Sequence, residues 1–232
     1  MQAGRSEVNR FRKNSEQMCT WRTLLGVTET RGERKERTRR AILDAALDLC
    51  EDSSLVALSL RGVAKEVGIV PTAFYRHFDS IEDLGLALVG ESLDSLRSVL
   101  RDARRLAAGV EEIIDASVGV LIARVRAEEQ HFAFIARERY AGPPLVREEI
   151  FRGLELFERE LATDLAHLPG VSGWSDRDLA DFSQLMVTAM VAVAERVIAA
   201  PTGPAVDQAL AETARRQLLM IVVGSMNWRS TG

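Results

Sequence analysis

The sequence predicts an all-α protein of about nine helices, and three observations support this fold class. Apolar residues recur at intervals of three or four positions from about residue 31 to the end of the chain, as they do in amphipathic helices. No segment alternates convincingly between apolar and polar residues, as a half-buried strand would. Proline and glycine fall between the periodic segments, where they end one helix or begin the next.

The first helix is expected to begin near Arg31. Residues 1–30 show no sustained periodicity and are predicted to form a disordered tail. The run 31–40 is rich in arginine and would form the first turns of the helix. Cations at a helix N-terminus oppose the helix dipole, so their placement suggests an anionic partner.

Residues 59–78 have the pattern of two short helices joined by a turn. Ser59 is suited to cap the first helix, and Gly68 is suited to follow its last residue. Pro71 stands where a second helix would begin, since its missing N–H is not needed there, and that helix would run to Phe78. A helix-turn-helix places its second helix in the major groove of DNA. We therefore predict a DNA-binding domain over residues 31–80.

Charge is divided unevenly along the chain, whose net charge is −4. Residues 1–80 carry 14 Lys and Arg against 11 Asp and Glu, whereas residues 81–232 carry 16 against 23. A basic front on an acidic body is expected when one end of a protein meets phosphate. A basic tail without a partner would produce the same asymmetry.

Several residues of the predicted domain can contact DNA. Ala73 could touch a thymine methyl group, and Arg76 could bind a guanine or a phosphate. Tyr75 and His77 can donate hydrogen bonds to phosphate oxygens, although each could also be an ordinary surface residue. The predicted DNA-binding set is Arg37, Thr38, Arg39, Ser59, Arg61, Thr72, Ala73, Tyr75, Arg76 and His77.

The remaining chain, residues 81–232, is predicted to form a ligand-binding and dimerisation domain. Its two last helices are rich in alanine, which allows close packing of helices, and they would form the surface between two subunits. Helical periodicity extends over 84–100, 110–125, 132–140, 150–165, 176–200 and 205–228.

Three strings resemble the DNA-binding domain of the TetR family: TRRAILDAA at 38–46, SLRGVAKEVGI at 59–69 and FYRHF at 74–78. The resemblance covers residues 34 to about 90. Within the family, PTAFYRHF at 71–78 and DLGL at 83–86 resemble the FabR and DesT branch, repressors of unsaturated fatty-acid synthesis and acyl desaturation. This resemblance implies a homodimeric repressor of a palindromic operator, with long-chain fatty acyl-CoA as its effector.

Two positions depart from the family pattern. Val70 stands where most members have a serine or threonine that caps the second helix. Ile81 stands where many carry a lysine that contacts phosphate. With one phosphate contact fewer, the binding constant for DNA should depend less steeply on salt concentration, with a log–log slope lower by about one. The arginines at 31–40 could compensate for the lost contact.

The resemblance also implies that an acyl chain lies between helices of the second domain, although periodicity alone makes the same residues ordinary core. The CoA end is polyanionic and would need cations, for which Arg137 and Arg139, or Arg104 and Arg105, are candidates. The predicted ligand-binding set is Leu96, Leu100, Phe132, Phe134, Arg137, Leu154, Phe157, Leu161, Phe182, Leu185 and Met186.

Other function classes find little support in the sequence. It contains no phosphate loop, nucleophile elbow or carboxylate-histidine iron set, so we expect neither an enzyme nor a cofactor. Two distant cysteines and three scattered histidines argue against a metal site. Without a membrane span or secretory signal we expect a cytoplasmic protein. Two alternatives stay open: a TetR-type regulator of multidrug efflux, and a helical lipid-binding protein with no DNA role.

Overall fold

The computed structural model describes residues 30–105, 110–167, 171 and 173–230, with the backbone alone for residues 98–105 and 110. Within these residues it contains nine α-helices, one short 3₁₀ helix and no strand, so the all-α prediction is confirmed. The predicted tail, residues 1–30, lies outside the described residues except for Thr30. The chain forms two compact units, residues 1–41 and residues 42–232.

The helix-turn-helix part consists of four elements. Their bounds are Arg31–Leu49 for α2, Leu55–Ala57 for the 3₁₀ helix η1, Leu60–Val67 for α3 and Pro71–Phe74 for α4. At the start of α2, the Thr30 hydroxyl accepts a hydrogen bond from the Glu33 N–H at 3.2 Å, and the Glu33 carboxylate accepts one from the Thr30 N–H at 2.9 Å. This reciprocal cap stabilises the end of a helix whose arginines oppose the dipole.

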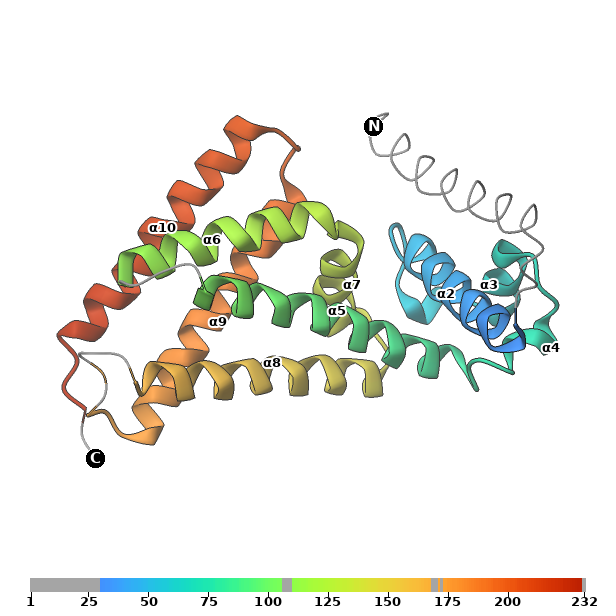
Figure 1. Ribbon diagram of the computed structural model, residues 1–232, viewed down its shortest axis with the longest axis horizontal. Helices are drawn as coiled ribbons and strands as arrows, with labels where there is room; N and C mark the ends of the chain where they lie inside the picture. Colours follow the sequence, from blue (N-terminus) through green and yellow to red (C-terminus); the bar gives the residue numbers. More distant parts are fainter. Residues whose placement is uncertain (1–29, 106–109, 168–170, 172, 231–232) are drawn as a thin grey trace. The chain divides into compact units, whose positions relative to one another are not determined.

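Six further helices follow and form a bundle (Figure 1). Their bounds are Ile81–Arg105 for α5, Val110–Ala127 for α6, Glu129–Ala141 for α7, Pro144–Leu165 for α8, Asp176–Ala199 for α9 and Pro204–Met226 for α10. Helices α5 and α8 run side by side, and α9 packs against both α8 and α10. Pro144 and Pro204 begin α8 and α10, where a missing N–H costs nothing.

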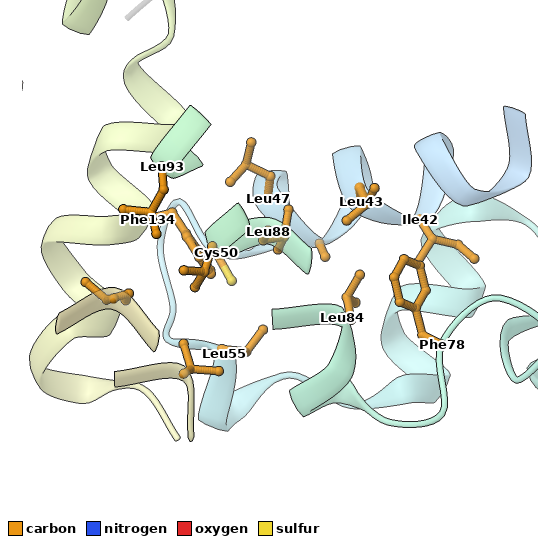
Figure 2. Close-up of a cluster of buried hydrophobic side chains, with 14 of the residues drawn as sticks. Ile42, Leu43, Leu47, Cys50, Leu55, Phe78, Leu84, Leu88, Leu93 and Phe134 are labelled. Carbon is orange, nitrogen blue, oxygen red and sulfur yellow. The ribbon is translucent and has the colours of Figure 1, made fainter. Parts of the chain in front are cut away.

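One hydrophobic core joins the helix-turn-helix part to α5, α7 and α8. Leu43 and Leu47 of α2 meet Leu88 of α5 and Phe134 of α7 in this core (Figure 2). The domain boundary predicted between residues 80 and 81 therefore lies within a shared core. A second core is formed by α6, α9 and α10.

Helix α4 is shorter than predicted, because it ends at Phe74 and not at Phe78. The backbone N–H groups of Arg76 and His77 donate to the carbonyl oxygens three residues earlier, at 3.2 and 2.8 Å. Such bonds tighten the chain beyond the α-helical turn. The recognition helix of the motif is thus a single α-helical turn that continues into a tighter turn.

Among the described residues, one helix is long and apolar enough to cross a membrane, namely α9. The sequence had led us to expect none. One such helix is weak evidence for a membrane span, since the core helix of a soluble protein meets the same criteria. Only 28% of its most apolar stretch is buried, however, so the described residues leave much of this apolar surface uncovered.

Candidate DNA-binding surface and ligand cavity

The turn between α3 and α4 is shaped by the two residues predicted to cap α3. The Oγ of Ser59 accepts a hydrogen bond from the backbone N–H of Gly62 at 3.1 Å. Gly68 follows α3 with a φ of 76°, in the left-handed region where a side chain is strained. The N–H of Ile69 then donates to the Ala64 carbonyl oxygen at 2.9 Å. Both predicted caps are confirmed.

Two phenylalanines attach the recognition helix to the core. Phe74 and Phe78 are buried, and their ring centroids are 5.9 Å apart. Thr72, Tyr75 and Arg76 are exposed, with 58% of Tyr75 open to solvent. The polar residues predicted to bind DNA on α4 and the turn after it are therefore accessible to a partner.

The other predicted DNA-binding residues of the motif differ in exposure. Ser59 and Arg61 are exposed at the start of α3, where the Ser59 hydroxyl also serves as the helix cap. Ala73 and His77 are only partly exposed. A base contact by the Ala73 methyl group would consequently use a small surface.

Three predicted DNA-binding residues lie on the first half of α2, within the compact unit that ends at residue 41. Arg37 is exposed, whereas Thr38 and Arg39 are partly buried. The Thr38 hydroxyl donates to the Arg34 carbonyl oxygen at 2.9 Å. That bond leaves the hydroxyl oxygen able to accept a further hydrogen bond.

The two departures from the family pattern have structural counterparts. Val70 is the N-cap residue of α4, makes no side-chain capping bond and is 64% exposed. Ile81 is partly buried and packs against the first core, so this position contributes to packing instead of phosphate binding. Val56 of η1 is also exposed, and nothing in the sequence pattern had identified it.

The C-terminal bundle contains a cavity of about 500 Å³, lined by residues of all six helices α5 to α10. Most lining side chains are aliphatic, aromatic or methionine. The structure brings seven residues of the predicted ligand-binding set together around it: Leu96, Phe132, Leu154, Phe157, Leu161, Phe182 and Met186.

Three other members of that set do not line the cavity. Phe134 is buried in the first core, on the side of α7 that faces α2 and α5. Arg137 is turned towards the loop after α2, where it donates to backbone carbonyl groups. Leu185 is 58% exposed on α9. The structure does not bring these three residues to the cavity, because periodicity does not tell which neighbour an apolar face meets. The side chain of Leu100 lies outside the described residues.

The cavity also has lining residues that the sequence did not identify. Helix α6 contributes four of them and α10 another four, and neither helix was represented in the prediction. The signal was present as apolar periodicity, but it did not separate cavity-lining residues from core. These residues are Ile113, Ile114, Ser117, Leu121, Leu218, Val222, Ser225 and Met226.

Few charged groups reach the cavity. The guanidinium of Arg139 pairs with the Glu195 carboxylate, with Nη2 and Oε1 2.6 Å apart, and stacks over the Tyr140 ring at 4.6 Å. Asp164 of α8 and His167, two residues after the end of that helix, also line the wall. In the part of the chain that the structure describes, no three His, Cys, Asp or Glu side chains are grouped to hold a metal ion.

The helix-turn-helix part matches a known family, and the whole fold matches solved structures. The family model of the bacterial regulatory proteins, tetR family, matches residues 42–88. A transcriptional regulator from Aquifex aeolicus VF5 has a TM-score of 0.60 at 19% identity, over 79% of this chain and 99% of that chain. The fatty acid degradation regulator FadR from Bacillus halodurans has a TM-score of 0.61 at 15% identity, over 78% and 94%.

A third similar structure is that of AibR in complex with isovaleryl coenzyme A and operator DNA. Its TM-score is 0.61 at 18% identity, over 78% of this chain and 97% of that chain. At such identities the solved structures establish the fold, while the family model covers the DNA-binding motif. Residues 42–88 are thus similar to the DNA-binding motif of the bacterial regulatory proteins, tetR family, and the fold of the chain is similar to that of the solved transcriptional regulators.

Proposed function

We propose that this protein is a transcriptional regulator of the TetR type, a homodimeric repressor whose DNA binding is controlled by a long-chain fatty acyl-CoA. Its target genes would be those of fatty-acid desaturation or synthesis, as in the FabR and DesT branch that residues 71–78 and 83–86 resemble. The observation that carries the proposal is the cavity of about 500 Å³ with its largely apolar lining. An acyl chain suits such a wall, because each buried methylene contributes about 0.8 kcal/mol.

Two of the similar structures support a ligand of this class. One is described as a regulator of fatty acid degradation, and the other was solved with isovaleryl coenzyme A and operator DNA. Isovaleryl is a short branched acyl group, so this similar structure does not support a long acyl chain. The proposed length of the acyl chain rests on the size of this protein's own cavity.

The polar end of an acyl-CoA would meet the pair of Arg139 and Glu195. A thioester carbonyl oxygen can accept a hydrogen bond from the Arg139 guanidinium in competition with the Glu195 carboxylate. Arg137, predicted to hold the CoA phosphates, is occupied by backbone carbonyl groups. The side chains of Arg104 and Arg105, the other candidates, lie outside the described residues.

The test begins with an operator selected from random double-stranded DNA by the full chain. Palmitoyl-CoA and oleoyl-CoA at micromolar concentration should change the affinity of the protein for this operator, whereas free CoA should not. Mass spectrometry of the purified protein should detect a co-purifying acyl lipid. An unchanged operator affinity with both thioesters would refute the proposed effector.

A second candidate, control by a cationic drug, is favoured by the Glu195 carboxylate in the cavity wall. Its side chain is 38% exposed, although the Arg139 guanidinium already neutralises it. A cationic aromatic dye should then release operator DNA in the native protein but not in Glu195→Gln. A response to the acyl-CoA thioesters alone would reject this candidate.

The dimer would place two recognition helices on one face of DNA. A two-fold axis puts equivalent motifs about one DNA turn apart, roughly 34 Å, which requires a palindromic operator. The ligand must favour one separation of the motifs over the other. Helix α5, which follows the motif directly, is the first route for this change. The protein would act in the cytoplasm, where bacterial DNA is located.

A further inference from the structure

Helix α7 has two sides with different contacts. Phe132, Ile135, Ala136 and Arg139 line the cavity, and their spacing places them on one face of the helix. The other side of α7 contacts residues 50–55, which lead from α2 into η1 and are called the 50–55 loop below. One helix thus lies between the cavity and the segment that precedes the DNA-binding motif.

One contact on that second side is made by Glu138, which is completely buried. Its Oε1 accepts a hydrogen bond from the Leu55 backbone N–H at 3.1 Å, and its Oε2 accepts one from the Ser54 hydroxyl at 3.1 Å. Hydrogen bonds to a carboxylate in a dry environment are strong and directional. Glu138 therefore fixes the point at which η1 begins.

Neighbouring residues of α7 extend the contact along the helix. The Arg137 guanidinium donates to the backbone carbonyl oxygens of Cys50, Glu51 and Ser53, the last two at 2.6 and 2.9 Å. Two turns earlier, the Gln130 amide donates to the Asp48 carboxylate at 2.8 Å. Phe134 fills the space between these bonds in the first core.

The 50–55 loop is also held from the other side. The Leu55 side chain packs so closely on Gly85 of α5 that a Cβ at residue 85 would overlap it. Gly142, just after α7, is equally constrained, since a Cβ there would lie 2.9 Å from the Glu138 carboxylate. The backbone N–H of Leu55 is thus hydrogen-bonded to α7, and the Leu55 side chain packs on α5.

We propose that α7 transmits occupancy of the cavity to the DNA-binding motif, and that Glu138 and Arg137 are the residues that carry the change into the 50–55 loop. The inference rests on the proposed function, in that some ligand occupies the cavity. A ligand that displaces the cavity side of α7 also displaces its loop side, because both sides belong to one rigid helix. The buried bonds leave the loop little freedom to stay behind.

The cavity is filled in two ways, and each is tested in the native chain and in variants of the contact between Glu138 and the 50–55 loop. Palmitoyl-CoA is the first way, and Ser117→Phe, which adds a ring from α6 and needs no ligand, is the second. Each is applied to the native chain and to the contact variants Glu138→Ala and Glu138→Gln. The glutamine variant retains an acceptor for the Leu55 N–H if alanine prevents folding. Glu129→Ala, an exposed glutamate in the first turn of α7, is the matched control.

Two quantities are measured: affinity for the selected operator, and amide hydrogen exchange of peptides covering residues 50–58, which requires no DNA. In the native chain and in Glu129→Ala, filling the cavity should change operator affinity by about 5- to 150-fold, the usual range of allosteric coupling, and should alter exchange of the loop. In Glu138→Ala the affinity change should fall below about threefold, and in Glu138→Gln to an intermediate value. Binding of palmitoyl-CoA itself should remain within about threefold of native.

The outcomes separate this inference from the proposed function. If only Ser117→Phe acts, and its effect is lost in Glu138→Ala, the acyl-CoA proposal fails while the role of α7 stands. Full coupling in Glu138→Ala, with faster exchange of the loop proving that the contact is broken, would overturn the inference. It would also be overturned if neither way of filling the cavity changed the loop or the operator affinity.

Discussion

Two glycines set how closely the helices of the first core approach. Gly153 of α8 is buried, and a Cβ at this position would overlap the side chain of Leu93 on α5. Gly85 of α5 has the same relation to Leu55. A methyl group added to a packed core forces neighbouring side chains away from their preferred rotamers.

Replacing Gly153 by alanine is therefore expected to lower the free energy of unfolding by about 1–3 kcal/mol. Gly90→Ala on α5 is the matched control, because a Cβ there meets no atom within 4 Å. In an exposed helix interior that change should raise stability by about 0.5–1 kcal/mol. Urea denaturation measures the change in the free energy of unfolding for both variants. Equal effects of the two substitutions would contradict the close approach of α5 and α8.

Cys50 provides a second residue-level prediction. Burial, and then the nearby Glu138 carboxylate, raise the pKa of its thiol to about 12. Since the thiolate is the reactive form, iodoacetamide at pH 8 should leave the Cys50 peptide of the native protein unmodified. The same peptide should be alkylated in denaturant, and mass spectrometry distinguishes the two. Rapid alkylation under native conditions would show that Cys50 is accessible.

Some residue roles could be predicted from sequence because they depend on near neighbours. The caps Ser59 and Gly68 follow from the chain within a few positions, and the burial of Phe74 and Phe78 follows from their spacing. The role of Arg137 could not be predicted in this way. Its three acceptors are backbone carbonyl groups more than 80 positions away, and no local pattern announces them.

At the scale of elements, the positions of proline and glycine predicted most helix ends correctly. The sequence predicted less completely which helix faces line the cavity. The break at 142–144 separates α7 from α8, and the break at 201–204 separates α9 from α10. Seven predicted ligand-binding residues share the cavity, but α6 and α10 also line it. An apolar helix face looks the same in sequence whether it meets a side chain or an empty space.

The proposed recognition element is one α-helical turn with Phe74 and Phe78 buried, so contacts with DNA would come from few side chains. Replacing Arg61 by alanine, or Thr72 by alanine together with Tyr75 by phenylalanine, should abolish retention of the operator in a gel shift. Arg152→Ala, an exposed arginine on α8 paired with Glu149, should leave it unchanged. Undiminished retention by the first two variants would exclude this motif as the DNA-binding surface.

Arg76 allows a finer test of how the motif uses charge. If its guanidinium contacts phosphate, Arg76→Ala should weaken binding to all sequences and lower the salt slope by about one. If it contacts a guanine, the loss should be about 1–3 kcal/mol and should relax specificity at one base pair. Titrations at several salt concentrations, with the operator and with random DNA, separate the two. No change in either slope or specificity would remove Arg76 from the interface.

At the scale of the whole molecule, α9 and α10 have more apolar surface than the other described residues cover. Most of the apolar stretch of α9 is not buried. Large apolar side chains of both helices are exposed, namely Leu185, Met220, Val223 and Met226. Exposed large apolar side chains on two helices in contact indicate a protein interface, and a second copy of the chain would supply the same two helices across a two-fold axis.

A charge placed in this surface should therefore separate the subunits. Met220→Glu with Val223→Glu puts two carboxylates into the proposed interface, where they would be buried without partners. Analytical ultracentrifugation should then show a monomer of 25.6 kDa in place of a dimer, and operator affinity should fall because one motif binds alone. Leu145→Glu, an equally apolar and exposed position on α8, controls for the added charge. A dimer that survives the double substitution would place the interface elsewhere, whereas a monomeric native chain would remove the geometric reason for a palindromic operator.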